Sequence, residues 1–268
     1  MTAKMFDLRG RAALVTGGNS GIGLGMAEGL AEAGADVAIW GMRKDRNEAA
    51  ARQLSRHGRK VHAELLDVSR EAEVERAMES TLAALGGLDA CFANAGVSGR
   101  AGPHRSFIEM TQAEWRRVLD VNLDGVFYTL KAAARAMVGR KQGGSLVATG
   151  SAFAIMGQPL VEHYAAAKAG VESMMRSLAV ELGQHAIRAN TVVPGYIETP
   201  LTTERINSEE FTNEHMPRLA IRRWGVPADF SGIAVYLASD ASRYVTGATI
   251  VIDGGLTIAA KVARDTVG

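Results

Sequence analysis

Residues 11–23 read Arg-Ala-Ala-Leu-Val-Thr-Gly-Gly-Asn-Ser-Gly-Ile-Gly, and this stretch decides the fold. The apolar run 11–16 is typical of a short buried strand, and a helical pattern follows over residues 22–33. A strand, a glycine-rich turn and a helix in this order favour dinucleotide binding, because glycines let the backbone approach a pyrophosphate and the helix amino terminus offers unpaired N–H groups. A glycine turn without a ligand is the alternative, since the spacing is wider than GxGxxG: Gly17-x3-Gly21-x-Gly23.

Strand-like and helix-like segments alternate through the rest of the chain. This alternation is typical of parallel strands joined by right-handed helical crossovers. We therefore expect an α/β fold, a single domain with a Rossmann-type doubly wound parallel sheet of about seven strands and helices on both faces. Further strands are expected at 36–40, 60–66, 88–93, 145–150, 187–193 and 249–252, and further helices at 49–57, 71–85, 111–137, 164–183 and 228–239.

The composition of the 268 residues is that of a globular chain. Apolar residues make up 47% and charged residues 22%, and the net charge of +1 comes from interspersed charges, which disfavours a nucleic-acid or membrane-binding surface. The single cysteine, Cys91, lies in an apolar run and is expected to be a buried thiol. The amino terminus lacks an apolar leader, so we expect a cytoplasmic protein. The six histidines lack metal-ligand spacing, so we expect no catalytic metal.

Tyr164-Ala-Ala-Ala-Lys168 is the second informative stretch. On a helix its two functional side chains share one face, because positions i and i+4 lie one above the other. A phenol has a pKa of about 10, and a neighbouring ammonium favours the phenolate and lowers that pKa. Ser151 follows the strand 145–150 and can place its hydroxyl beside the phenol. The three side chains predict a proton-transfer site for a carbonyl or an alcohol, although Tyr-x3-Lys also occurs in helices by chance.

The turn after the second strand bears on cofactor choice. In a dinucleotide fold this turn faces the adenosine ribose, where an acidic residue accepts bonds from the 2′-hydroxyl and cations accommodate a 2′-phosphate. Here the turn reads Gly41-Met42-Arg43-Lys44, and the first acidic residue, Asp45, follows both cations. The pattern favours NADP over NAD, with solvated surface charge as the alternative explanation for Arg43 and Lys44.

Other local features are more ambiguous. Asp67 follows a strand, where it can accept from an adenine amino group or cap the next helix. Asn122 lies inside an expected helix, where asparagine more often faces solvent than forms a site. His163, just before the tyrosine, is expected on the helix surface. Two segments without regular pattern follow strand ends: the loop 97–110, and residues 196–225, which we expect to form a lid over the site.

Taken together, these segments resemble the short-chain dehydrogenase/reductase family, over about residues 8–256. Each motif alone is weak, but their order and context are specific. The resemblance divides the domain into a cofactor-binding and catalytic core (8–195), a substrate lid (196–225) and a closing helix and strand (226–256). The matching motifs are Thr16-Gly-Gly-Asn-Ser-Gly-Ile-Gly23, Asp67-Val68, Asn94-Ala-Gly96, Asn122, Ser151, Tyr164 with Lys168, Pro194-Gly195 with Thr199, and Asp253-Gly-Gly255.

The resemblance implies specific roles in an NAD(P)-dependent oxidoreductase, and a homotetramer. Tyr164 would be the general acid in reduction and the general base in oxidation. Lys168 would lower the pKa of that phenol and bind the nicotinamide ribose. Ser151 would hydrogen-bond the substrate oxygen, and Asn122 would support a water-mediated proton path. The cofactor-binding residues implied are Gly17, Asn19, Ser20, Gly21, Ile22, Gly23, Arg43, Asp67, Val68, Asn94, Ala95, Gly96, Tyr164, Lys168, Pro194, Gly195, Ile197 and Thr199.

The chain departs from both cofactor signatures of the family. NAD-preferring relatives usually carry Asp where this chain has Gly41, and NADP-preferring relatives often carry Arg at the position of Met42 or Ser20. We expect hydride transfer between NADP(H) and a carbonyl or secondary alcohol. The alternatives are an NAD-dependent dehydrogenase of sugars, polyols or other hydroxy compounds, a 3-oxoacyl thioester reductase and, outside the enzymes, a cofactor-binding regulator without activity.

Overall fold

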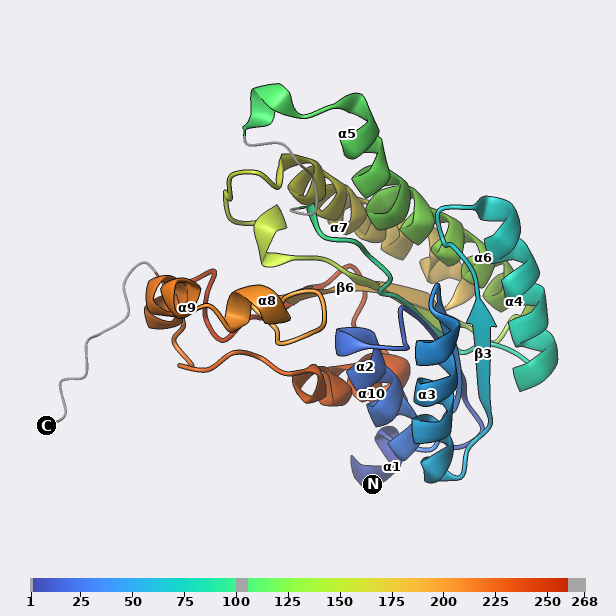
Figure 1. Cartoon of the computed structure of the whole chain (residues 1–268). Coiled ribbons are helices and arrows are strands. Elements are labelled where there is room, and N and C mark those ends of the chain that lie inside the picture. Colours follow the sequence, from blue (N-terminus) through green and yellow to red (C-terminus); the bar gives the residue numbers. More distant parts are fainter. Residues whose placement is uncertain (1, 100–105, 260–268) are drawn as a thin grey trace, which may run out of the picture.

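The computed structural model describes residues 2–99 and 106–259, and the strands of this part form one seven-stranded parallel sheet (Figure 1). The spatial order is β3-β2-β1-β4-β5-β6-β7, so the chain reverses direction across the sheet between β1 and β4. Doubly wound sheets bind ligands outside the carboxyl ends of the strands at such a point. The strands are β1 (Ala12–Thr16), β2 (Asp36–Gly41), β3 (Val61–Leu65), β4 (Ala90–Ala93), β5 (Gly144–Thr149), β6 (Ile187–Pro194) and β7 (Thr249–Ile252).

Helices cover both faces of the sheet, which confirms the expected α/β class (Figure 1). One face carries α2 (Gly21–Glu32), α3 (Lys44–Leu54) and α10 (Ser231–Ala238). The other face carries α4 (Glu71–Leu85), α6 (Gly125–Arg140) and α7 (Glu162–Leu182). The remaining helices are α1 (Thr2–Met5), α5 (Gln112–Leu119), α8 (Thr203–Ile206) and α9 (Glu209–His215).

The central strands are apolar because both faces of the sheet are covered there. Every residue of β1 is buried, as expected for a parallel strand between two helical layers. Successive side chains alternate between the two cores: Leu14 packs on the α4 side and Val15 on the α2 side. Cys91 is fully buried on the α4 side, and burial raises the pKa of its thiol to about 12. The expected burial of the thiol is confirmed.

Several expected elements match and others need correction. The helix 71–85 and the strand 249–252 have the predicted bounds. The expected helix 111–137 is instead two helices, α5 and α6, separated by a π-helical turn, Asp120–Asp124. Helix α3 begins at Lys44, earlier than expected. The sequence did not mark this start because the charged first turn of the helix carries no apolar periodicity. Residues 100–105 of the expected loop 97–110 lie outside the described residues.

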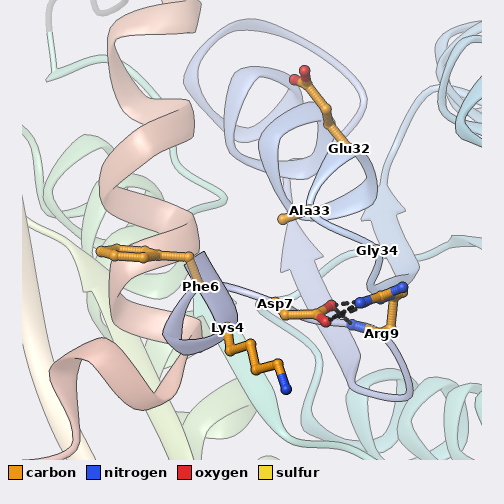
Figure 2. Close-up of a pocket in the computed structure, with 7 residues that line it drawn as sticks. All are labelled: Lys4, Phe6, Asp7, Arg9, Glu32, Ala33 and Gly34. Atoms are coloured by element: carbon orange, nitrogen blue, oxygen red, sulfur yellow. Dashed lines mark hydrogen bonds and ion pairs between the residues drawn. The ribbon is translucent and has the colours of Figure 1, made fainter. Parts of the chain in front are cut away.

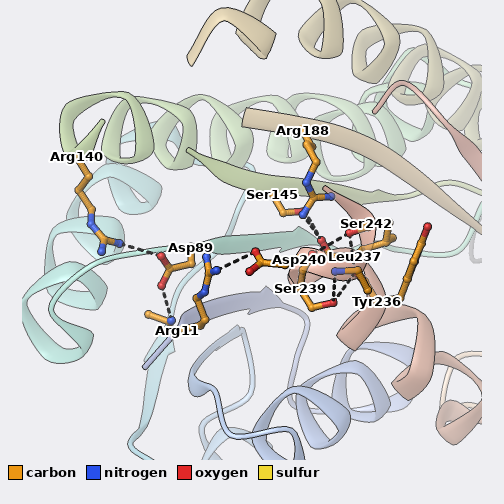
Figure 3. Close-up of polar contacts among 12 residues, drawn as sticks. Arg11, Asp89, Arg140, Ser145, Arg188, Tyr236, Leu237, Ser239, Asp240 and Ser242 are labelled. Atoms are coloured by element: carbon orange, nitrogen blue, oxygen red, sulfur yellow. Dashed lines mark hydrogen bonds and ion pairs between the residues drawn. The ribbon is translucent and has the colours of Figure 1, made fainter. Parts of the chain in front are cut away.

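A polar network ties the amino ends of the strands together, at the edge opposite the site (Figure 3). The Asp89 carboxylate accepts from the Ala12 amide at 2.7 Å, and Arg11 pairs with Asp240 at 2.9 Å. Both Arg188 and Ser145 donate to the carbonyl oxygen of Leu237, each at 2.7 Å. The two bonds to the Leu237 carbonyl join β5 and β6 to α10, so their role is structural.

A surface hollow lies at the far end of α2 from the glycine-rich turn (Figure 2). Two of its charged side chains pair with each other, because Arg9 donates to the Asp7 carboxylate. The residues that line the hollow come before β1 and from the end of α2, so the hollow lies away from the carboxyl edge of the sheet, where the fold places chemistry. No helix in the described part of the chain combines the length and the apolar content needed to cross a bilayer.

Candidate active site

Three strand-end residues build the floor of the site. The Thr16 hydroxyl accepts from the backbone amides of Asn94 and Ala95, at 3.0 and 2.9 Å, which joins the end of β1 to the end of β4. The Asn94 side chain donates to the Thr16 carbonyl at 3.1 Å and accepts from the Thr149 hydroxyl at 3.0 Å. The ends of β1, β4 and β5 are thereby locked together. Asn94 and Ala95 were expected in the site; Thr16 and Thr149 were not given roles.

Ser151, Tyr164 and Lys168 meet above this floor, as the sequence predicts. The Ser151 hydroxyl accepts from the Phe153 amide at 3.2 Å, which orients it at the start of a 3-10 turn, Ala152–Ala154. It also hydrogen-bonds the Tyr164 phenol. The Lys168 ammonium donates to the Thr149 carbonyl at 2.8 Å and lies 5.7 Å from the centre of the Tyr164 ring. A hydroxyl pair beside a fixed cation can bind a carbonyl oxygen and exchange a proton with it.

Burial controls the acid–base properties of this pair. It raises the pKa of the Tyr164 phenol, and the hydrogen bond with Ser151 opposes that rise. It lowers the pKa of Lys168 to about 8, because a charged ammonium is poorly solvated there. In the chain by itself burial dominates and the pKa of the phenol lies above its ordinary value, so the lowering by Lys168 that the resemblance implies stays a prediction. Tyr164 is a protonated phenol at neutral pH, which is the form that a general acid needs.

The shifted lysine makes a testable contribution to stability. Its pKa in the folded chain, about 8, lies below the ordinary 10.5, so the unfolded chain binds more protons between these two values. The free energy of unfolding should therefore rise with pH across this window, by up to about 3 kcal/mol for this one group. In urea unfolding at both ends of the window, Lys168→Met should lose this rise. An unchanged pH dependence in the variant would contradict the buried-ammonium account.

Asn122 is fully buried in the π-helical turn, not solvent-facing as its helical position had favoured. Its amide nitrogen donates to the carbonyls of Val97 and Val118, at 3.1 and 3.0 Å, and its oxygen accepts from the Val97 amide at 3.3 Å. The side chain fixes the segment after β4 against the helices. Because both N–H groups are used, Asn122 can serve a proton path through its side chain only as an acceptor.

Gly96 lies between Asn122 and the lysine. A Cβ at this position would lie 2.6 Å from the Asn122 side-chain oxygen and 3.8 Å from Lys168 Nζ. Only glycine leaves room at this point, which explains the requirement for Gly in the motif Asn94-Ala-Gly96.

His163 is also fully buried, so the expected surface position is wrong. Its ring packs under the segment after β4: a Cβ on Gly99 would lie 3.2 Å from His163 Cε1 and 2.8 Å from Tyr164 Cβ. The residues that cover the histidine come from a remote part of the sequence, and helical periodicity alone gives no sign of them.

The glycine-rich turn has the geometry that a dinucleotide pyrophosphate needs. Gly17 and Gly21 have φ of 65° and 53°, values that favour glycine. A Cβ on Gly23 would lie 2.4 Å from the Gly17 carbonyl oxygen, so the turn packs closely on the start of α2. The N-cap residue Ser20 makes no side-chain cap bond. The first amides of this 12-residue helix thus remain available to an anion.

At the end of β2 two asparagines occupy the space beside Gly41. Asn19 donates to Asn47 at 2.6 Å, and Asn47 donates to the carbonyls of Gly41 and Glu64 at 3.0 and 2.8 Å. A Cβ on Gly41 would lie 2.2 Å from the Asn19 amide nitrogen, so an acidic side chain needs Asn19 to move. Arg43 is exposed but donates twice to Asp45, at 3.1 and 3.0 Å. Asn47, which is 4% exposed, had no sequence motif to mark it.

The other expected cofactor residues line the same edge, with differing roles. Asp67 accepts from the Ser69 amide at 3.0 Å, and Arg70 occupies the N-cap position of α4 without a side-chain cap bond, so the capping alternative for Asp67 is wrong. Val68 is buried against Gly125. Thr199 packs on the glycine-rich turn, 3.1 Å from where a Gly21 Cβ would lie. Ser20 and Ile22 lie in the turn, and Pro194, Gly195 and Ile197 lie at the end of β6.

Within the described residues, no three His, Cys, Asp or Glu side chains converge on a metal position.

Comparison with known proteins agrees with this geometry. Residues 17–257 match the family model described as enoyl-(acyl carrier protein) reductase. A solved structure of a short-chain type dehydrogenase/reductase from Mycobacterium marinum superposes with a TM-score of 0.88 at 37% identity, covering 96% of this chain and all of that one. This chain belongs to the short-chain dehydrogenase/reductase family. As a member it is an NAD(P)-dependent oxidoreductase acting on CH–OH and C=O groups.

Individual relatives in the family act on different substrates. The 3-oxoacyl-[acyl-carrier-protein] reductase of Chlamydia muridarum is 36% identical over 247 residues, which is 92% of this chain and 97% of that protein. A gluconate 5-dehydrogenase from Burkholderia cenocepacia, solved with NADP and tartrate, superposes with a TM-score of 0.89 at 34% identity and covers 96% of this chain and 99% of its own. Family membership therefore fixes the reaction class and leaves the substrate to the site itself.

Proposed function

We propose that the protein is an NADP(H)-linked carbonyl reductase or secondary-alcohol dehydrogenase. The observation that carries this proposal is the hydrogen-bonded Ser151–Tyr164 pair beside a buried Lys168 ammonium, next to a glycine-rich turn shaped for a pyrophosphate. All three groups needed for proton transfer to a carbonyl are present and oriented, so a regulator without activity is disfavoured.

The chain's own residues would handle the substrate oxygen and its proton. Ser151 accepts the Phe153 N–H and can direct its own proton to the carbonyl oxygen. Tyr164, kept protonated by burial, would donate its proton to that oxygen in reduction and recover it in oxidation. The Lys168 ammonium, held by the Thr149 carbonyl, would stabilise the phenolate left behind. The bound nicotinamide supplies or accepts the hydride.

The preference for NADP rests on the ribose end of the site. Gly41 leaves no acidic side chain for a 2′-hydroxyl, and Arg43 stands at the start of α3 beside that position. The NADP complex of the gluconate 5-dehydrogenase supports this choice. The ion pair between Arg43 and Asp45 favours the alternative, an NAD-dependent dehydrogenase of sugars, polyols or hydroxy compounds. A guanidinium that is held by Asp45 is less available to a 2′-phosphate.

Removing the competitor for Arg43 should strengthen NADPH binding. An exposed ion pair is weak, so Asp45→Asn should lower the Kd for NADPH by no more than about fivefold and leave that for NADH unchanged. Arg43→Ala should raise the Kd for NADPH by about tenfold. Fluorescence titration of each variant with both cofactors measures these values without turnover.

Arg52→Ala is the matched control, because this arginine lies in the last turn of the same helix. It should change neither Kd. Equal responses of NADPH and NADH to Arg43→Ala would show that the guanidinium does not read the 2′-phosphate, and would favour the NAD alternative.

Three further parts of the proposal concern organisation. Residues 196–225, which contain α8 and α9, would act as the substrate lid over the core 8–195, and 226–256 would close the sheet. Family membership and exposed apolar side chains such as Phe127 and Val251 support a homotetramer, for which light scattering should give about four times the 28.4 kDa chain mass. We also place the protein in the cytoplasm, consistent with its single, buried thiol.

A further inference from the structure

A row of aromatic rings runs from the catalytic tyrosine into the lid segment. The Phe153 ring meets the Tyr164 ring edge-on, with centroids 6.4 Å apart and planes at 73°. On its other side Phe153 meets Tyr196, 6.0 Å away at 74°. Tyr196 in turn contacts Phe211, His215 and Trp224. These separations are those of favourable edge-to-face pairs.

The far end of the row is a small core of the lid. Besides Phe153, Tyr196 has three rings around it, at 5.3, 5.1 and 5.8 Å, and Phe211 stacks on His215 at 4.0 Å. His215 is 5% exposed and its ring bonds the Phe211 carbonyl at 3.1 Å. An apolar cluster of Ala152, Leu219 and Leu256, with Met156, Met216 and Trp224 against it, continues this packing. The rings at this end pack against one another, so their role is to hold the lid together.

The near end of the row is different, because Phe153 lies next to the reacting groups. It is two residues after Ser151, its amide donates to the Ser151 hydroxyl, and its ring touches the Tyr164 ring. Phe153 is half-buried, and its ring contacts two aromatic neighbours, Tyr164 and Tyr196. A carbonyl oxygen held by the two hydroxyls therefore brings the adjoining substituent of the substrate to the Phe153 side chain.

We propose that Phe153 determines specificity and that the substrate class is a ketone with an aromatic or bulky apolar substituent next to the carbonyl. This inference rests on the proposed carbonyl-reductase function and names its substrate. Apolar substituents gain from contact with this half-buried ring. The hydroxyls of a sugar or polyol, placed against the same surfaces, would lose bonds to water without replacement.

Two methyl ketones that differ in one substituent test the inference. Phenylacetone and hydroxyacetone share the group CH3–CO–CH2 and carry a phenyl or a hydroxyl. With NADPH, the wild-type kcat/KM should be at least about tenfold higher for phenylacetone. Phe153→Ala should lower that value about 10- to 100-fold, the usual range for lost apolar contacts in a pocket, and change the hydroxyacetone value little. Phe153→Leu should retain most of the phenylacetone activity.

Phe6→Ala is the matched control, since Phe6 is an exposed ring beside α1 that lines the surface hollow (Figure 2). It should change neither substrate. Equal NADPH affinity in wild type and Phe153→Leu, measured by titration, would show that the cofactor site is intact if Phe153→Ala folds poorly.

The outcomes separate the two levels of the proposal. A wild-type preference for hydroxyacetone, 5-ketogluconate or an acetoacetyl thioester over phenylacetone would overturn the apolar-ketone inference and leave the carbonyl-reductase function standing. Equal losses for both methyl ketones in Phe153→Ala, with Phe153→Leu equally impaired, would overturn the role of Phe153. Absence of turnover with every ketone would overturn the proposed function, and this inference with it.

Discussion

Tyr164→Phe should lower kcat for ketone reduction by about 10²- to 10⁴-fold, the contribution of a positioned general acid. The change removes one oxygen and keeps the ring that packs against Phe153, so the local fold should persist. The Kd for NADPH should stay within about twofold of wild type, because the phenol acts on the substrate oxygen. Stopped-flow turnover and fluorescence titration on the same preparation measure the two quantities.

Tyr128→Phe provides a matched control for this change. Tyr128 is a half-buried tyrosine on α6 whose ring pairs with Phe127, away from Ser151 and Lys168. Its variant should keep wild-type kcat. A fully active Tyr164→Phe enzyme would contradict the assignment of the phenol as the proton donor.

Gly23→Ala should weaken NADPH binding by at least about tenfold. The added Cβ would lie 2.4 Å from the Gly17 carbonyl oxygen and 2.5 Å from the Asn94 side chain, so the glycine-rich turn must shift. Overpacking of this kind costs about 1–3 kcal/mol, and here the distortion falls on the backbone that would hold the pyrophosphate. NADPH and NADH should be affected equally, because both carry that group.

Gly139→Ala is the control for the added methyl group. Gly139 lies within α6, and a Cβ there meets no atom within 4 Å. Because Gly139 is the second-last residue of α6, this variant should bind both cofactors normally and its stability should change little. Normal cofactor binding by Gly23→Ala would show that the turn does not hold the pyrophosphate.

Local patterns were enough to predict the sheet and the central pair of the site. Buried parallel strands are nearly continuous apolar runs, so β1 stands out. The edge strand β7 is marked by its β-branched residues, and the regular apolar spacing of α4 marks both of its ends. The i and i+4 spacing of Tyr164 and Lys168 places them on one helical face, which the structure confirms.

Features that depend on distant residues could not be read from local patterns. The π-helical turn around Asn122 is held by bonds to Val97, which lies in another segment. His163 is buried by the segment that contains Gly99, and Asn47 is fixed by carbonyls of β2 and β3. The polar residues that end buried strands, Thr16 and Thr149, were the one available signal for the floor of the site.

The most direct test of the central claim is to follow the hydride itself. NADPH labelled with deuterium at both C4 positions is incubated with the enzyme and the ketone that it reduces fastest, and the alcohol is analysed by mass spectrometry and NMR. We expect one deuterium on the carbinol carbon of each product molecule, and no product from Tyr164→Phe above the reduced rate given above. Alcohol without deuterium at that carbon, or oxidation of NADPH without alcohol, would contradict hydride transfer to a carbonyl.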